Sequence, residues 1–479
     1  MIRSLMLSAA MCFGALAAAQ DITVAGIFTD GMVLPRDRTF PVWGTGSAGV
    51  TITVALAGKT VTATTGADGQ WKAVLGPLAA GGPHELTITG AKTITCANVL
   101  IGDVWLCAGQ SNMEFALRFS ATAEADVPAA KHPQIRLFTV TPTFSATPGA
   151  DVPKDAPWQE CTPETARHFS AVGYYFGKHL HEKLKIPIGL IDASWGGTPA
   201  EAWTSEAGLA ACPEFAPVIA AVRAPAATPA PAKFDQNAPT VLFNAMIEPL
   251  VPFGIRGVIW YQGEANSYRA FQYRTLFPAL IRDWRTQWAQ GDFPFLFVQL
   301  ANFTAPQKRS GDSHWAELRE AQLMTLSLPK TGMAVAVDIG EEKDVHPRNK
   351  AEVGRRLGLA AMAVEYGEKS VYSGPIFSKQ TIEGCTIRLR FDHIGDGLVA
   401  KGGEPIKHVA IAGEDRKFVW ATATISGDEV IVSSPEVPKP VAVRYDWAEN
   451  PDGNLYNREG LPASPFRTDD WPGITKPKP

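Results

Sequence analysis

Three short apolar runs constrain the fold of this chain more than any other feature of its sequence. They occupy residues 104–107, 188–195 and 257–261, and glycine, serine or amide residues follow each one closely. Unbroken apolar runs of this length are typical of strands that are buried on both faces of a parallel sheet. The carboxyl ends of such strands meet at one edge, which is where open α/β sheets bind their ligands.

Helix-like segments alternate with these runs. The spacing of apolar residues predicts helices at 172–184, 313–326 and 350–365. Because strands and helices alternate, we expect a doubly wound α/β domain with a parallel sheet, over residues 99–369.

Segments in which polar and apolar residues alternate flank this domain. They predict a β-sandwich-like module at 20–98 and a second β-rich module at 370–479. With 479 residues, the chain is longer than one ordinary core supports, so several domains are expected.

Residues 1–19 have the character of a secretory signal peptide. Arg3 precedes an apolar stretch, and the alanines at 17–19 are typical of a cleavage site. The stretch is shorter than the ~20 apolar residues that span a bilayer. We therefore expect an exported protein, periplasmic or extracellular, with no membrane span.

Ser111 is the candidate nucleophile, because it lies where an apolar run gives way to a predicted helix. A serine hydroxyl is almost fully protonated at neutral pH and attacks a carbonyl only with the help of a base. His346 is the candidate base, and Asp344 is the carboxylate that would orient it. Pro347 favours an extended backbone at His346, and residues two apart in an extended segment share one face.

An ester hydrolase also needs donors for the oxyanion of its intermediate. The candidates are the backbone N–H groups of Ser111 and Gly197, and a side-chain amide of Gln262 or Asn266. Gly197 lacks a Cβ, so its backbone can approach a ligand closely. The sequence leaves the choice between the two amides open.

Four blocks carry these residues: GQSNM, SWGGTPAEAW, WYQGEAN and DVHPRNK. In order and separation they resemble the SGNH hydrolases, and within them the sialate O-acetylesterase-like carbohydrate esterases. The resemblance implies a flavodoxin-like sheet, with Ser111 as nucleophile, His346 as base, and Gly197 with Gln262 or Asn266 in the oxyanion hole. It also implies a serine esterase that removes O-acetyl groups from a carbohydrate through an acyl-enzyme, with no cofactor and no metal. Asp344 precedes His346 by two positions, where three are common in the superfamily.

Residues beside the blocks predict contacts with a sugar. Trp195, Trp260 and Tyr261 offer aromatic faces, and Glu264 offers a carboxylate. Since large aromatic side chains also fill cores, the alternative for each of them is a buried packing role.

The formal charge of −4 lacks the basic excess of nucleic-acid-binding proteins, so nucleic acid is not an expected partner. We expect an acetylated mono-, oligo- or polysaccharide as substrate, and the sequence leaves open which sugar it is and what the oligomeric state is. The alternative function is a non-catalytic carbohydrate-binding protein on an esterase-derived scaffold. An assay of acetate release distinguishes the two.

Overall fold

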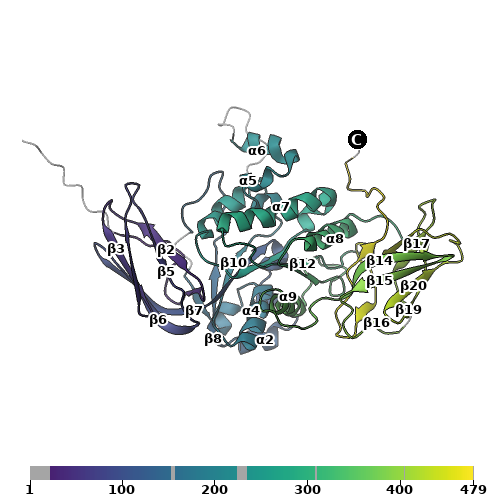
Figure 1. Cartoon of the computed structure of the whole chain (residues 1–479), viewed down its shortest axis with the longest axis horizontal. Coiled ribbons are helices and arrows are strands. Elements are labelled where there is room, and N and C mark those ends of the chain that lie inside the picture. Colours follow the sequence, from purple (N-terminus) through teal and green to yellow (C-terminus); the bar gives the residue numbers. More distant parts are fainter. Residues whose placement is uncertain (1–21, 153–156, 224–234, 308–309, 404, 478–479) are drawn as a thin grey trace, which may run out of the picture.

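The computed structural model describes residues 22–152, 157–223, 235–307, 310–403 and 405–477. The expected signal peptide at 1–19 lies outside them. The described chain forms an elongated molecule, with a β module at one end, a sheet flanked by helices in the middle, and a second β-rich module at the other end (Figure 1).

A parallel sheet forms the centre of the molecule. Its strands lie in the order β13-β12-β11-β7-β10-β8, and β9 adds an antiparallel edge. Their bounds are β7 (Thr93–Gly109), β8 (His132–Thr139), β9 (Gln159–Cys161), β10 (Ile188–Ser194), β11 (Gly257–Tyr261), β12 (Phe295–Gln299) and β13 (Thr331–Val335). The predicted α/β sheet is confirmed, and the three apolar runs lie in its neighbouring strands β7, β10 and β11.

Helices cover both faces of this sheet. α4 (Ala171–Leu184) and α9 (Lys350–Val364) pack together on one face, and α7 (Ala270–Trp288) and α8 (His314–Met324) on the other (Figure 1). Side-chain oxygens cap the starts of α4, α8 and α9, where the first N–H groups of a helix lack intrahelical partners. The remaining short α-helices are α1 (Ser111–Glu114), α2 (Ala123–Ala129), α3 (Pro163–Ala166), α5 (Glu206–Leu209) and α6 (Ala216–Arg223).

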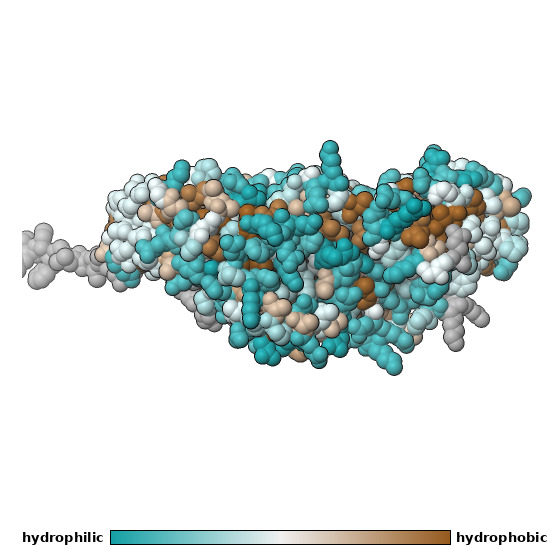
Figure 2. Space-filling view, turned by 90° about the horizontal axis from the view of Figure 1, so that it is seen from below, coloured by the Kyte–Doolittle hydropathy of each residue, from teal (hydrophilic) through white to brown (hydrophobic). Residues whose placement is uncertain are grey.

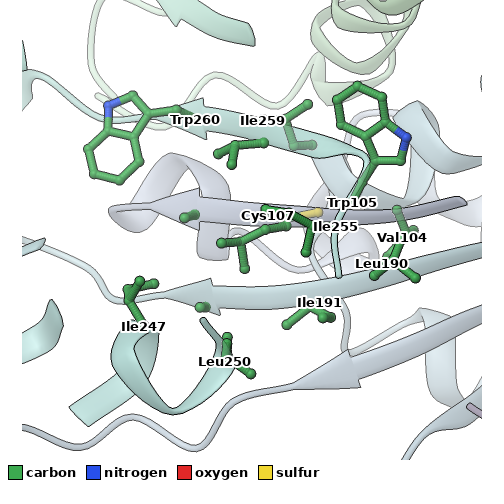
Figure 3. Packing of buried hydrophobic residues seen from close by; sticks show 14 of the residues in the cluster. Val104, Trp105, Cys107, Leu190, Ile191, Ile247, Leu250, Ile255, Ile259 and Trp260 are labelled. Carbon is green, nitrogen blue, oxygen red and sulfur yellow. The ribbon is translucent and has the colours of Figure 1, made fainter. Parts of the chain in front are cut away.

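The central strands are apolar on both faces because both faces are covered. Trp105, Ile191, Ile259 and Trp260 are all inaccessible to solvent, and Figure 3 shows them with their neighbours from β7, β10 and β11. A strand buried on both faces gains nothing from alternation, which explains why these segments are predominantly apolar, with Asp192 and Ser194 of β10 as polar exceptions.

Strand β7 joins the N-terminal module to the sheet without a break. It pairs antiparallel with β6 in the module and then parallel with β10 and β11. The expected boundary between residues 98 and 99 falls inside it, at Asn98, whose φ is +57°. The module and the α/β domain share one hydrophobic core. The module's other strands are β1 (Val33–Pro35), β2 (Phe40–Thr45), β3 (Thr51–Leu56), β4 (Lys59–Thr64), β5 (Gln70–Leu75) and β6 (Gly81–Thr89).

The C-terminal module has a hydrophobic core of its own. Two sheets, ordered β14-β15-β20-β19 and β18-β17-β21-β23, and the pair β16-β22 build it. Arg319 of α8 ties it to the α/β domain, since its guanidinium donates to the carbonyls of Ala448 and Glu449. The strands are β14 (Ile376–Glu383), β15 (Thr386–Asp392), β16 (Leu398–Ala400), β17 (Val409–Ala412), β18 (Val419–Trp420), β19 (Thr422–Ser426), β20 (Glu429–Ser433), β21 (Ala442–Tyr445), β22 (Leu455–Asn457) and β23 (Phe466–Arg467).

The surface is largely polar on the side seen in Figure 2, where hydrophobic residues gather in separate groups between hydrophilic ones. Among the helices that the structure describes, none combines the length and the apolar character needed to cross a bilayer.

Candidate functional site

The turn after β7 presents Ser111 at the carboxyl edge of the sheet. Gly109 ends the strand with φ +134°, and a Cβ there would lie 2.2 Å from the carbonyl oxygen of Tyr261. Only glycine fits this close approach between β7 and β11. The backbone N–H of Gln110 donates to the same carbonyl, and α1 begins at Ser111.

His346 meets Ser111 across 235 positions of sequence. Its Nε2 lies 2.8 Å from Ser111 Oγ, and its Nδ1 lies 3.2 Å from Asp344 Oδ1. The same carboxylate oxygen accepts the backbone N–H of His346 at 2.9 Å, which fixes the short loop between them. With the Nδ1 proton donated to Asp344, Nε2 is free to accept the proton of the serine hydroxyl. The structure thus brings the three predicted triad residues into contact.

This triad is open to solvent on its carboxylate side. The side chain of Asp344 is 52% exposed and that of His346 is 35% exposed. Phe115 stacks near the imidazole, with ring centroids 6.4 Å apart. Asp338, an acid eight positions before His346, instead binds the guanidinium of Arg356 at 2.7 and 2.8 Å.

The glycine turn after β10 lies beside Ser111. A Cβ at Gly196 would lie 3.3 Å from Ser111 Cβ, and its N–H donates to Glu114 Oε2 at 2.7 Å. Gly197 has φ +75°, is exposed, and has open space where a Cβ would stand. Its backbone is therefore accessible to a ligand next to the nucleophile.

The amides expected in the oxyanion hole are used inside the protein. Gln262 is fully buried, and its Nε2 donates to the Thr198 carbonyl and to Asn266 Oδ1, so neither amide hydrogen remains for an oxyanion. Asn266 Nδ2 donates to Glu201 Oε2 at 2.9 Å. The prediction of Gln262 as a donor is wrong in this structure, and the Asn266 amide is held by Glu201. Both side chains instead join the loop after β11 to the segment after β10 through hydrogen bonds.

The expected sugar contacts divide into one surface residue and three interior ones. Trp260 and Tyr261 are fully buried, because β11 lies in the middle of a sheet that is covered on both faces (Figure 3). They are core residues, and the prediction that they bind substrate is wrong. Trp195 remains half-buried and faces Phe144 at a ring distance of 6.3 Å.

Glu264 is also turned inward, contrary to the prediction that it binds substrate. Its Oε1 accepts from Asn112 Nδ2 at 2.6 Å, and its Oε2 is buried without a partner. Burial raises the pKa of this carboxyl group, against the opposing effect of its hydrogen bonds.

No role was predicted for Asn112 or Lys350, although Asn112 lies in the block GQSNM and Lys350 in the block DVHPRNK. Asn112 Oδ1 accepts from Lys350 Nζ. Burial lowers the pKa of Lys350 to about 7, against the raising effect of Glu264. Lys350 begins α9 among other charged residues, Glu352, Arg355 and Arg356, so no local pattern signals its burial, and its partner Asn112 is 238 positions away.

Over the residues that the structure describes, no group of three or more histidine, cysteine, aspartate and glutamate side chains is arranged to hold a metal ion.

Comparisons with known proteins agree with this geometry. A family model described as "Carbohydrate esterase, sialic acid-specific acetylesterase" matches residues 101–364. Sialate O-acetylesterases of Pongo abelii and Homo sapiens are each 34% identical over 94% of this chain and 93% of their own. A crystal structure of a carbohydrate acetylesterase from Xanthomonas citri superposes with a TM-score of 0.87, at 44% identity, covering 94% of this chain and 100% of that one.

Proposed function

Because this chain belongs to the family of sialic acid-specific acetylesterases and is a carbohydrate O-acetylesterase, we propose that it is an exported serine esterase working through Ser111, His346 and Asp344. The contact of 2.8 Å between Ser111 Oγ and His346 Nε2 carries the proposal. A nucleophile and a base within hydrogen-bonding reach are the first requirement of acyl transfer.

Acylation begins with attack of Ser111 Oγ on the acetyl carbonyl carbon. As the C–O bond forms, the hydroxyl proton moves to His346 Nε2, and the imidazolium is stabilised by Asp344. When the tetrahedral intermediate collapses, the bond between the acetyl carbon and the sugar oxygen breaks. Nε2 returns its proton to that oxygen, and the deacetylated sugar leaves while the acetyl group stays on Ser111.

Deacylation repeats the sequence with water as the nucleophile. His346 Nε2 accepts a proton from water as its oxygen attacks the acetyl carbon, and Ser111 Oγ recovers that proton when its bond to carbon breaks. Acetate leaves, and the free enzyme is restored. No cofactor is needed for either half of the reaction.

Backbone groups supply the oxyanion hole in this proposal. The N–H of Ser111 stands at the first position of α1, and Gly197, whose backbone is open, follows Gly196, where a Cβ would lie 3.3 Å from Ser111 Cβ. One such donor is typically worth about 2.7–4 kcal/mol of transition-state stabilisation. The Asn266 amide donates one of its two hydrogens to Glu201 Oε2, so its second hydrogen is left as a candidate donor.

The names of the relatives support a proposal for the substrate, and the amino-terminal residues support one for the location. Since the similar mammalian proteins are named sialate O-acetylesterases, O-acetylated sialic acid is the first substrate to test, followed by acetylated xylan and xyloglucan. The signal-like residues 1–19 support export, so the substrate is met in the periplasm or outside the cell.

The test is release of acetate from this panel by the wild type and by Ser111→Ala. We expect a single preferred glycan for the wild type and a loss of at least about 10³-fold in kcat for the variant, at unchanged thermal stability. Activity of Ser111→Ala near the wild-type rate would overturn the mechanism. An inactive wild type with bound, intact acetylated sugar would instead favour a carbohydrate-binding protein.

A further inference from the structure

Three segments of the site meet at the side chain of Asn112. It follows Ser111 directly and is buried. Its Nδ2 donates to Glu264 Oε1 at 2.6 Å and to the carbonyl of Val345 at 3.0 Å, and its Oδ1 accepts from Lys350 Nζ. Since Val345 directly precedes His346, one amide links the nucleophile turn, the histidine loop and the loop after β11.

The partners of Asn112 fix the orientation of its amide. Lys350 Nζ only donates, whereas the Glu264 carboxylate and the Val345 carbonyl accept. A flipped amide would set its NH₂ group against the ammonium group and its oxygen against two acceptors. The two loops are therefore joined by an amide with one allowed orientation.

The two charged partners of Asn112 are placed where stability alone does not favour them. Lys350 is fully buried, with Nζ 4.8 Å from the ring of Phe115 and 5.1 Å from that of Tyr261. Glu264 keeps one buried oxygen without a partner. Because burying a charged pair costs more than packing apolar residues in its place, this arrangement calls for a functional reason.

We propose that Asn112 and Lys350 are positioning residues: with Glu264 they clamp the nucleophile turn to the histidine loop and so hold Ser111 Oγ within reach of His346 Nε2. This inference rests on the proposed function, because it assigns the support of that same Ser–His pair. We refer to Asn112, Lys350 and Glu264 as the clamp.

The members of the clamp also act on one another through their charges. The cation of Lys350 lowers the pKa of Glu264, and the carboxylate of Glu264 raises the pKa of Lys350, in each case against the effect of burial. Removing one member takes away this support, and burial then favours the neutral form of the other.

Kinetics of Lys350→Met and Asn112→Ala test the positioning role. We expect kcat for an acetylated sugar to fall by about 10–100-fold in each, with little change in KM, because misplacing a reacting group by about 1 Å costs rate and not binding. Arg256→Met is the matched control, since Arg256 binds the buried Asp103 at the far edge of the sheet. It should leave kcat unchanged.

A double-mutant cycle in kcat separates this role from a general loss of packing. If Asn112 and Lys350 hold Ser111 and His346 together through one linkage, Asn112→Ala/Lys350→Met should lose no more kcat than the more impaired single variant. Asn112→Ala/Asp103→Asn, the matched control, joins two distant sites and should show the kcat of Asn112→Ala alone.

Reduced kcat in both single variants, with no further loss in the double variant, would establish the clamp. Wild-type kcat in both Lys350→Met and Asn112→Ala, or losses that multiply in the double variant, would overturn it. If Lys350→Met does not fold, Glu264→Gln and the double variant Lys350→Met/Glu264→Gln carry the test, because their buried charges are reduced or removed. Ser111→Ala keeps the two proposals apart: an inactive Ser111→Ala beside fully active clamp variants refutes the clamp alone.

Discussion

Two buried charge clusters lie at opposite ends of the parallel strands, and their hydrogen-bonding groups are satisfied to different degrees. At the amino edge, Asp103 accepts hydrogen bonds from Arg36 at 3.0 and 3.1 Å, from Arg256 at 2.9 Å and from the Tyr366 hydroxyl at 2.8 Å. At the carboxyl edge, the clamp leaves one oxygen of Glu264 without a partner.

The pKa shifts of the cations follow the same division. Burial lowers the pKa of Arg256, but the charge of Asp103 outweighs it and the net pKa is raised. For Lys350, burial prevails and the pKa is lowered to about 7. The amino edge therefore stabilises the fold, while the carboxyl edge holds groups under electrostatic strain next to the reacting atoms.

The largest expected effect on stability comes from the amino edge. Arg256→Met removes one of two cations from a fully buried carboxylate, and we expect the free energy of unfolding to fall by about 3 kcal/mol. Urea denaturation measures this loss, and kcat of the folded fraction should stay at the wild-type value. If Arg256→Met had a reduced kcat but wild-type stability, the amino edge would not differ from the carboxyl edge in the way proposed.

The pH dependence of stability sharpens the contrast. Lysine in the unfolded chain titrates near 10.4. Between about pH 7 and pH 10 the unfolded chain thus binds more protons at Lys350 than the folded chain does, so stability rises with pH, by up to about 1.4 kcal/mol per pH unit. Lys350→Met should lose this increment relative to the wild type in urea titrations at several pH values.

Arg256→Met is again the control for the pH series. Because the pKa of Arg256 is raised, this side chain stays charged in both states below pH 12 and adds no slope. We expect Arg256→Met to lower the free energy of unfolding by the same amount at every pH. Equal slopes for Lys350→Met and wild type would show that Lys350 keeps its ordinary titration in the folded protein.

The smallest expected effect on stability comes from the exposed carboxylates. Asp344 and Asp37 are similarly exposed, at 52% and 56%, and each pairs with one cationic or imidazole group. Their Asn variants should each change the free energy of unfolding by less than about 0.5 kcal/mol. Only Asp344→Asn should slow acetate release, by about tenfold, which corresponds to about 1.4 kcal/mol in the barrier. Equal rates for both variants would leave Ser111 and His346 as a dyad.

The sequence predicted those features that depend on neighbours along the chain. The three runs identify the buried strands because each is predominantly apolar and lacks the alternation of a half-exposed strand, and Pro347 with the spacing of Asp344 and His346 predicts their contact. The order of the four blocks predicts that Ser111 and His346 share one edge of the sheet. Their measured contact follows from that topology.

Features that depend on side-chain direction in a covered sheet were not predictable in this way. Trp260 and Gln262 lie at the end of a central strand that is covered on both faces. Both side chains are therefore buried in the protein and do not reach a ligand at the surface. The bond between Asn112 and Lys350 joins positions far apart in the chain, which no local pattern reports. The boundary expected at 98/99 fails to separate two strands because β7 runs through it.

The continuity of β7 has a consequence for how the molecule can be rebuilt. The same peptide segment is a strand of the amino-terminal module and leads directly to Ser111, the proposed nucleophile, so removing the module would also remove the strand that holds Ser111 in place. The C-terminal module has a separate core, but hydrogen bonds join it to the α/β domain, among them those of Arg319. Replacing the C-terminal module therefore requires new partners for these side chains, whereas replacing the amino-terminal module interrupts a strand of the central sheet.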